Sequence, residues 1–276
     1  MKNAGQLART KRLKGIWLVG LTAILAYVVF TFQETRQLGE PAIITGYSLL
    51  AVMLGLAFYN MRKRLSMLPL GRSAVWLSVH AVGGVVAIAL FFLHTGTFWP
   101  TGIYEQVLAI LFYLVSITGI VGYFLQRMYP HRITETGVEV IYERIPAELA
   151  AMREKAEAVV VECTEETGSD TLARSYLETL SWYFRQPRFF WAHALGDPKA
   201  DHWVRTNCNT VRRYLNDAEN TYLDQIEEMA EIKAKIDFHY AAQSIMKRWL
   251  LFHVPFSASV LVLALWHLFI IHVYAL

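Results

Sequence analysis

Five long apolar segments constrain this 276-residue chain more than any other feature of its sequence. They cover residues 16–33, 42–60, 74–94, 104–125 and 250–274. The length of each segment is close to the number of residues, about 20, that an α-helix needs to cross a bilayer. Charged residues make up only 18% of the chain, whereas a soluble domain carries about 25%. The sequence therefore predicts an all-α membrane protein with five transmembrane helices.

The segments divide the chain into four transmembrane helices (1–128), a mostly helical insert (129–248) and a fifth transmembrane helix (249–276). Basic residues gather before the first segment and in the loop between the second and third: Lys2, Arg9, Lys11, Arg12, Lys14, Arg62, Lys63, Arg64 and Arg72. The positive-inside rule then places the N-terminus and the insert in the cytoplasm and the C-terminus outside. The expected location is a bacterial cytoplasmic membrane.

Four histidines stand at a repeated interval in two of the apolar segments. His80 and His94 are fourteen residues apart in the third segment, and His253 and His267 are fourteen apart in the fifth. Fourteen helical residues rise about 21 Å and complete nearly four turns, so the two histidines of each segment share one face. Because the two segments run in parallel in the expected topology, His80 faces His253 near the cytoplasm and His94 faces His267 near the outside.

Two such imidazole pairs suit two b-type haems, each with its iron held by two histidines. A single histidine in a membrane helix can instead line a water cavity or bond a backbone carbonyl. A histidine-lined metal path is a further alternative, although no acidic residues accompany the four histidines. Gly83 and Gly84 would let a flat macrocycle approach the helix backbone, and close helix packing is the alternative reading of both glycines.

These residues resemble those of a known family. HAVGGVVAIALFFLHTG (80–96), ITGIVGYFL (117–125) and HVPFSASVLVLALWHLFIIH (253–272) are similar to the second, third and fourth membrane helices of the b-type subunit of cytochrome bc complexes. The resemblance covers about 70 residues and implies a four-helix-type di-haem core in the di-haem transmembrane cytochrome b superfamily. It carries iron ligation to His80 and His253 for an inner haem and to His94 and His267 for an outer haem.

The chain also departs from that family. Two spans precede the first histidine helix, the P-E-W-Y quinol-site motif is missing, and about 120 residues separate the fourth and fifth segments. The topology is closer to that of ferric reductases and NADPH oxidases. The resemblance therefore leaves the electron donor and acceptor open.

Further residues are assigned by their position beside the histidines. Arg72, Lys247 and Arg248 lie just cytoplasmic of His80 and His253, where they could neutralise the propionates of the inner haem, although the positive-inside rule alone also places them there. His272 stands where the bc family has a histidine beside a bound quinone. It is a candidate quinone ligand, and the alternative is that it satisfies free carbonyls at a helix end.

The insert carries no recognisable catalytic or nucleotide-binding motif. The segment 132–146 is expected to form a short hairpin or extended piece, a helix follows Pro146, a second begins after Ser169 or Asp170, and 203–248 is a long helix or helical pair. Residues 189–201 are expected to be a loop. The aromatic residues of 182–191 are either a local core or a partner interface, and the acidic balance of the insert argues against nucleic acid. Cys163 and Cys208 are too few for a disulfide framework.

The sequence thus predicts a membrane cytochrome b subunit of a respiratory or redox complex, with redox partners that dock on 129–248 and a periplasmic or quinone partner near the outer haem. A self-contained ferric or quinone reductase is one alternative. A haem-free structural or assembly subunit is the other.

Overall fold

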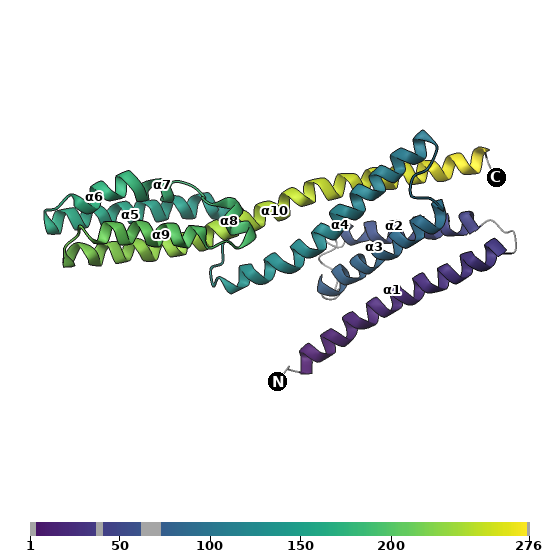
Figure 1. Ribbon diagram of the computed structural model, residues 1–276, viewed down its shortest axis with the longest axis horizontal. Coiled ribbons are helices and arrows are strands. Elements are labelled where there is room, and N and C mark those ends of the chain that lie inside the picture. Colours follow the sequence, from purple (N-terminus) through teal and green to yellow (C-terminus); the bar gives the residue numbers. More distant parts are fainter. Residues whose placement is uncertain (1–3, 37–40, 62–72, 275–276) are drawn as a thin grey trace. The chain divides into compact units, whose positions relative to one another are not determined.

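The computed structural model describes residues 4–36, 41–61 and 73–274, and every element in these ranges is helical (Figure 1). Five helices are long and apolar enough to cross a membrane. They are α1 (Ala4–Arg36), α2 (Pro41–Met61), α3 (Ser73–Thr95), α4 (Ile103–Glu135) and α10 (Asp217–Tyr274). The prediction of an all-α chain with five candidate membrane helices is confirmed.

The chain divides into two compact units. The first, the membrane unit, comprises residues 1–124 and 249–276, and the second, the insert unit, comprises 125–248. Helices α4 and α10 each continue from one unit into the other.

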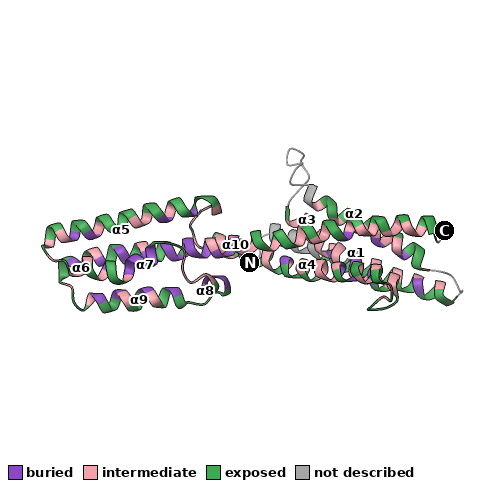
Figure 2. Ribbon diagram, turned by 90° about the horizontal axis from the view of Figure 1, so that it is seen from above, coloured by how far each residue is buried: buried purple, intermediate pink, exposed green. Residues whose placement is uncertain are grey.

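A small apolar core joins four helices of the membrane unit: Leu49, Ala87, Leu90, Phe91, Ala109, Phe112 and Val260. The rings of Phe91 and Phe112 stack at 4.3 Å between centroids. Large apolar side chains also point outward, for example Val19 at 68% exposure and Val262 at 64%. Figure 2 shows the resulting prevalence of exposed and intermediate residues on these helices. An apolar outer surface of this extent is what a lipid-facing helix bundle presents.

The insert unit contains η1 (Tyr142–Arg144), α5 (Ile145–Thr167), α6 (Thr171–Ser175), a π-turn η2 (Tyr176–Leu180), α7 (Ser181–Phe184), α8 (Phe190–Leu195) and α9 (Lys199–Arg212). Helix α5 begins with Pro146 in its first turn and ends at Gly168, whose φ of 67° is the left-handed conformation that suits glycine. Helix α10 begins at a capping box, in which Asn216 and Glu219 exchange two hydrogen bonds of 2.9 Å.

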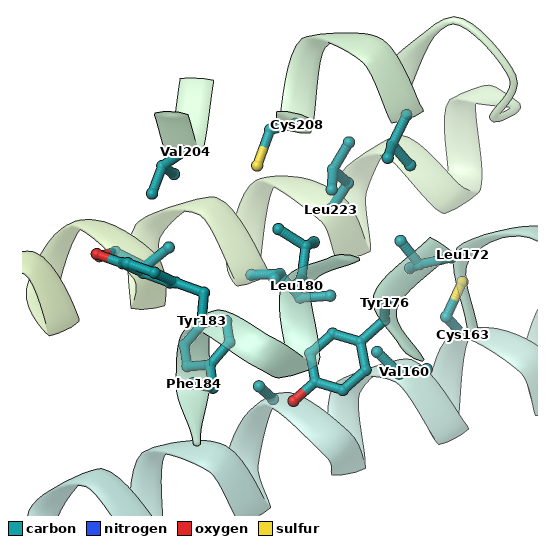
Figure 3. Close-up of a cluster of buried hydrophobic side chains, with 14 residues drawn as sticks. Val160, Cys163, Leu172, Tyr176, Leu180, Tyr183, Phe184, Val204, Cys208 and Leu223 are labelled. Carbon is teal, nitrogen blue, oxygen red and sulfur yellow. The ribbon is translucent and has the colours of Figure 1, made fainter. Parts of the chain in front are cut away.

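The core of the insert unit is shown in Figure 3. It gathers fully buried side chains from α5, η2, α7, α9 and α10, among them Tyr176, Leu180, Tyr183 and Leu223. Both cysteines lie in this core with no exposed surface. Most of the 182–191 aromatics belong to this core or its edge, because Trp182, Tyr183 and Phe189 all pack on Trp203.

Two local expectations differ in their outcome. The segment after α4 turns at Gly137 (φ 69°) as a Thr-Gly turn should. Of the two alternatives for this segment, no hairpin forms among these described residues, and residues 138–141 are a short non-helical piece that ends in the extended backbone of Ile141. The side-chain amide of Gln243 instead accepts from the Tyr142 N–H (2.9 Å) and donates to the Val140 carbonyl (2.8 Å), which replaces a strand partner. Residues 190–195 form helix α8 where a loop was expected, because His193 and Ala194 bury one face of that turn.

A buried ion pair lies within the insert part of α10. Lys233 and Asp237 have no exposed side-chain surface, and their Nζ and Oδ2 atoms are 2.5 Å apart. Lys233 also donates to the Gln186 carbonyl (3.0 Å), and Asp237 accepts from the Arg188 N–H (3.1 Å). Burial lowers the pKa of Lys233 and raises that of Asp237, while the charge of each partner opposes the shift of the other. Each charge is therefore tolerated only in the presence of the other.

The first prediction concerns this pair. Lys233→Met leaves a buried carboxylate without its cation, which should lower the free energy of unfolding of the insert unit by about 3–5 kcal/mol. The double substitution Lys233→Met/Asp237→Leu should recover most of that loss, and Lys235→Met, at an exposed position of the same helix, should change little. Native-state hydrogen exchange of the core amides measures all three. Equal exchange in Lys233→Met and Lys235→Met would contradict the assignment.

Candidate functional site

The structure brings the four histidines of α3 and α10 together as two pairs. The ring centroids of His80 and His253 are 6.4 Å apart with their planes at 76°, and those of His94 and His267 are 6.4 Å apart with their planes at 82°. The pairing is the one that the fourteen-residue interval predicts. Among the described residues, the α3 backbone packs closely on α2 and α1, whereas α3 and α10 meet mainly through side chains.

The His94 ring is oriented by α2. Its Nδ1 lies 2.8 Å from the backbone carbonyl of Ala42. A carbonyl only accepts hydrogen bonds, so Nδ1 carries a proton, and in the neutral imidazole Nε2 then presents the lone pair. Gly46, one turn further along α2, makes room for this ring, because a Cβ atom there would come within 2.8 Å of His94 Cε1.

The His253 ring is oriented by α4. Its Nδ1 lies 2.9 Å from the hydroxyl of Thr118, and that hydroxyl donates its own proton to the Leu114 carbonyl at 2.8 Å. Thr118 Oγ1 must then accept from His253, which again puts the lone pair of the neutral imidazole on Nε2. The indole of Trp249 stacks on the ring at 5.2 Å and donates to the Thr118 carbonyl at 2.7 Å. Gly122 leaves room for that indole.

The rings of the other two histidines, His80 and His267, each pack against a tyrosine ring. His80 lies 4.9 Å from the ring of Tyr59, beside the backbone of Leu56, and its buried Nδ1 has no hydrogen-bond partner. His267 stacks on Tyr104 at 6.0 Å, and the Tyr104 hydroxyl donates to the Leu263 carbonyl at 2.5 Å.

The distance between paired rings tests whether one metal ion fits between them. A five-membered ring with bonds of about 1.35 Å has each atom about 1.15 Å from its centroid, and a metal–imidazole bond is about 2.0 Å long. Two imidazoles on opposite sides of one metal therefore have centroids about 6.3 Å apart. Both observed separations are 6.4 Å. The donor set, two neutral imidazoles with Nδ1 hydrogen-bonded where a partner is seen, also fits bis-histidine haem ligation.

A cavity of about 360 Å³ adjoins the His94–His267 pair. Most of its lining is apolar, with Phe91, Leu108 and Phe112 among the side chains, and its polar groups include Glu105 and His272. The volume lies within the range of ordinary ligand pockets, about 300–1,000 Å³.

The two glycines of α3 differ in their surroundings. A Cβ atom at Gly83 would come within 2.8 Å of Leu56 Cδ2, so Gly83 faces α2 and serves helix packing. A Cβ atom at Gly84 would meet nothing within 4 Å. Only Gly84 therefore keeps open space of the kind that a macrocycle needs.

The basic residues expected near the inner haem are engaged elsewhere or not described. Arg72 lies outside the described residues. The Arg248 guanidinium lies over the ring of Phe190 at 5.7 Å, and Lys247 forms an ion pair with Glu143. Neither contact points to a propionate.

His272 has both ring nitrogens engaged. Its Nδ1 donates to the Leu268 carbonyl at 2.9 Å, so its Nε2 accepts from the Tyr47 hydroxyl at 2.7 Å. The Leu268 carbonyl lies inside α10, one turn before His272, so this bond does not satisfy a free carbonyl at the helix end. In this arrangement the neutral ring has no N–H left for a quinone. Both residues nonetheless line the cavity beside the His94–His267 pair.

The insert histidines do not gather into a site. Burial lowers the pKa of His193 to about 4 and also lowers that of His239, so both are neutral, whereas His131 pairs with Glu135 at the surface. Within the described ranges, no group of three or more His, Cys, Asp or Glu side chains is placed to hold a metal ion. A haem iron with two protein ligands does not require such a group.

Comparisons with known proteins return no matching family model, curated protein or solved structure.

Four supporting residues escaped the sequence analysis: Gly46, Tyr104, Thr118 and Trp249. Thr118 lies inside the ITGIVGYFL stretch singled out by resemblance, which was the one available signal. Gly46 lies in a helix that supplies no histidine of either pair, so the spacing of the histidines along α3 and α10 could not predict its role.

The second prediction tests the close approach at Gly46. Gly46→Ala should lower stability by about 1–3 kcal/mol, because the His94 ring must move or lose its bond to Ala42. Gly55→Ala is the matched control on the same helix, since a Cβ there meets nothing within 4 Å. It should be neutral or stabilising by up to about 1 kcal/mol. Thermal unfolding in detergent measures both, and equal midpoints would show that His94 does not need the glycine.

Proposed function

We propose that this protein is a membrane cytochrome b that carries electrons across a bilayer through two bis-histidine haems. His80 and His253 hold one haem, and His94 and His267 hold the other. When bound, haem iron supplies reversible one-electron chemistry. The protein's part is to hold the four imidazoles, to keep the Nε2 atoms of His94 and His253 available through their Nδ1 hydrogen bonds, and to surround the rings with apolar side chains.

One observation carries the proposal. Two separate imidazole pairs, one at each end of the fourteen-residue interval, have the same separation of 6.4 Å between ring centroids. The separation alone is not specific, since the rings of Tyr183 and Phe189 are also 6.4 Å apart. The support comes from finding a histidine pair that can accept a metal ion at both ends of the same fourteen-residue interval. The interval of about 21 Å between the pairs along α3 spans much of the about 30 Å hydrocarbon core, which suits electron transfer from one side to the other.

The hydrogen bonds of His94 and His253 serve the same end. A ligating histidine with its Nδ1–H bonded to an oxygen keeps one tautomer and one ring orientation, and becomes a better donor. Ala42 and Thr118 therefore act as positioning groups for opposite ends of the proposed electron path.

Electron partners are assigned by location. A quinone is a candidate for the cavity beside His94 and His267, since the cavity is mostly apolar and lies within the membrane unit. The insert unit is a docking platform for a redox subunit. The proposed location is a bacterial cytoplasmic membrane, with the N-terminus and insert inside and the C-terminus outside, as the distribution of basic residues favours.

The visible spectrum of the purified protein is the direct test and the third prediction. Two low-spin b haems per chain are expected. His80→Ala and His94→Ala should each remove about half of the low-spin signal, because the two pairs share no residue. His202→Ala, at an exposed position of the insert, should remove none. A colourless protein would overturn the proposal in favour of a structural or assembly subunit, and rapid reduction by a soluble donor without partner subunits would favour a self-contained reductase.

The fourth prediction concerns Thr118. Thr118→Val keeps the shape of the side chain but removes the acceptor for His253 Nδ1–H, which should weaken haem retention at that pair by about 10–100-fold. Thr118→Ser keeps the hydroxyl and should stay near the parent. Haem loss to an excess of a haem-scavenging apoprotein gives the comparison. If the valine and serine variants lose haem equally slowly, the hydroxyl does not support the ligand.

A further inference from the structure

Helix α8 lies at the end of the insert unit from which the membrane helices leave. Its first residue, Phe190, packs on Tyr240 and lies beneath the guanidinium of Arg248. Near its other end, the Ala194 carbonyl accepts from the Tyr129 hydroxyl at 3.2 Å. The helix is thus attached to α10 through one end and to α4 through the other.

Both attachment points are close to the apolar stretches of α4 and α10. Tyr129 is four residues beyond Leu125, about 6 Å along the helix, and Arg248 directly precedes Trp249. The polar headgroup region of a bilayer is about 5–7 Å deep on each side of the hydrocarbon core. If α4 and α10 cross a membrane through their apolar stretches, α8 is held at the level of the headgroups.

Helix α8 has one buried and one exposed face. His193 and Ala194 are buried against the insert unit, whereas Trp191 is 70% and Leu195 is 81% exposed. Trp191 and Leu195 are four residues apart, so their side chains lie next to each other on the outer face. Tryptophan and leucine on the outer face of a membrane-level helix are typical of contact with the bilayer interface.

Arginines lie near both ends of α8. Arg132 packs against Gly196, at the end of α8, and lies over Phe238, while Arg188 lies over Trp182 and Arg248 over Phe190. Each of these three arginines makes a cation–π contact with an aromatic ring, and none of them forms an ion pair with a described carboxylate. Asp197, which follows α8, is the nearest acid in sequence, and its Oδ1 accepts from the Lys199 N–H. Glu135, Asp201 and Glu231 line a pocket with Arg132, Gly196 and Asp197 at this end of α8. The cations available to anionic lipid headgroups are therefore those at its N-terminal end, Arg188 and Arg248.

We propose that α8 is an interfacial anchor, in which Trp191 and Leu195 enter the cytoplasmic headgroup region of the bilayer and the nearby arginines bind anionic phospholipid. The anchor would fix the insert unit to the membrane surface through α8. It rests on the five helices crossing a membrane and is independent of the proposed haems, so a colourless protein would leave it standing.

The experiment uses the full-length protein in lipid nanodiscs of phosphatidylcholine and phosphatidylglycerol that contain doxyl-labelled lipid. A fluorescent probe is attached to Leu195→Cys, to Trp191→Cys as a second position, and to Tyr214→Cys as the matched control. Tyr214 is 74% exposed and lies just before the first residue of α10. That first residue is about 48 Å from Trp249 along the helix axis, so a probe at position 214 lies far from the apolar stretch of α10. Cys163 and Cys208 are fully buried, and burial raises the pKa of Cys208 to about 12, so they do not take the label.

Quenching at 195 and 191 should exceed quenching at 214 by at least about twofold, since an interfacial helix buries its apolar face about 5–10 Å into the acyl boundary. Replacement of phosphatidylglycerol by phosphatidylcholine should reduce that difference. Equal quenching at all three positions, weak or strong, would overturn the anchor. An unchanged difference in phosphatidylcholine alone would overturn the role of anionic lipid.

Discussion

The direction in which two of the imidazoles point depends on oxygen atoms supplied by helices that contribute no member of either pair. The Ala42 carbonyl of α2 fixes His94, and the Thr118 hydroxyl of α4 fixes His253. Each bond requires a proton on Nδ1, so in the neutral imidazole the lone pair is on Nε2, which does not take part in the bond to the supporting helix. Helices α3 and α10 supply the four imidazole rings, and α2 and α4 supply the oxygen atoms that orient the rings of His94 and His253.

This division explains why close packing is uneven in the membrane unit. Helix α2 must approach α3 closely enough for its backbone to accept a bond from His94, and Gly46 allows that approach. Helix α10 meets α3 through rings, and it meets α4 through Trp249 and Tyr104, whose polar atoms donate to backbone carbonyls. Long aromatic side chains keep helices apart while still fixing their register, which preserves space beside the histidine pairs.

The sequence was sufficient for features that depend on period and composition. Apolar runs of about 20 residues identified the five candidate membrane helices, and a fourteen-residue interval identified which histidines would meet. It failed where a side chain replaces backbone pairing, as Gln243 does at Val140 and Tyr142, and where a short segment gains its helix from burial, as 190–195 does. Gly46 and Thr118 were missed as supporting residues because their roles arise from contacts between helices, which spacing along one helix does not encode. Arg248 was assigned by proximity in sequence, whereas its guanidinium lies over an aromatic ring of the insert.

The two acceptors differ in how they respond to mutation. The oxygen that holds His94 belongs to the main chain, so changing the side chain at position 42 does not remove it. The oxygen that holds His253 belongs to a threonine side chain, and one nucleotide change to an alanine codon would delete it. Related proteins are thus free to vary the environment of His253 through a single codon, while the orientation of His94 is protected from point mutation at its acceptor. The two histidine pairs joined by α3 and α10 therefore differ in how easily point mutations can change their surroundings.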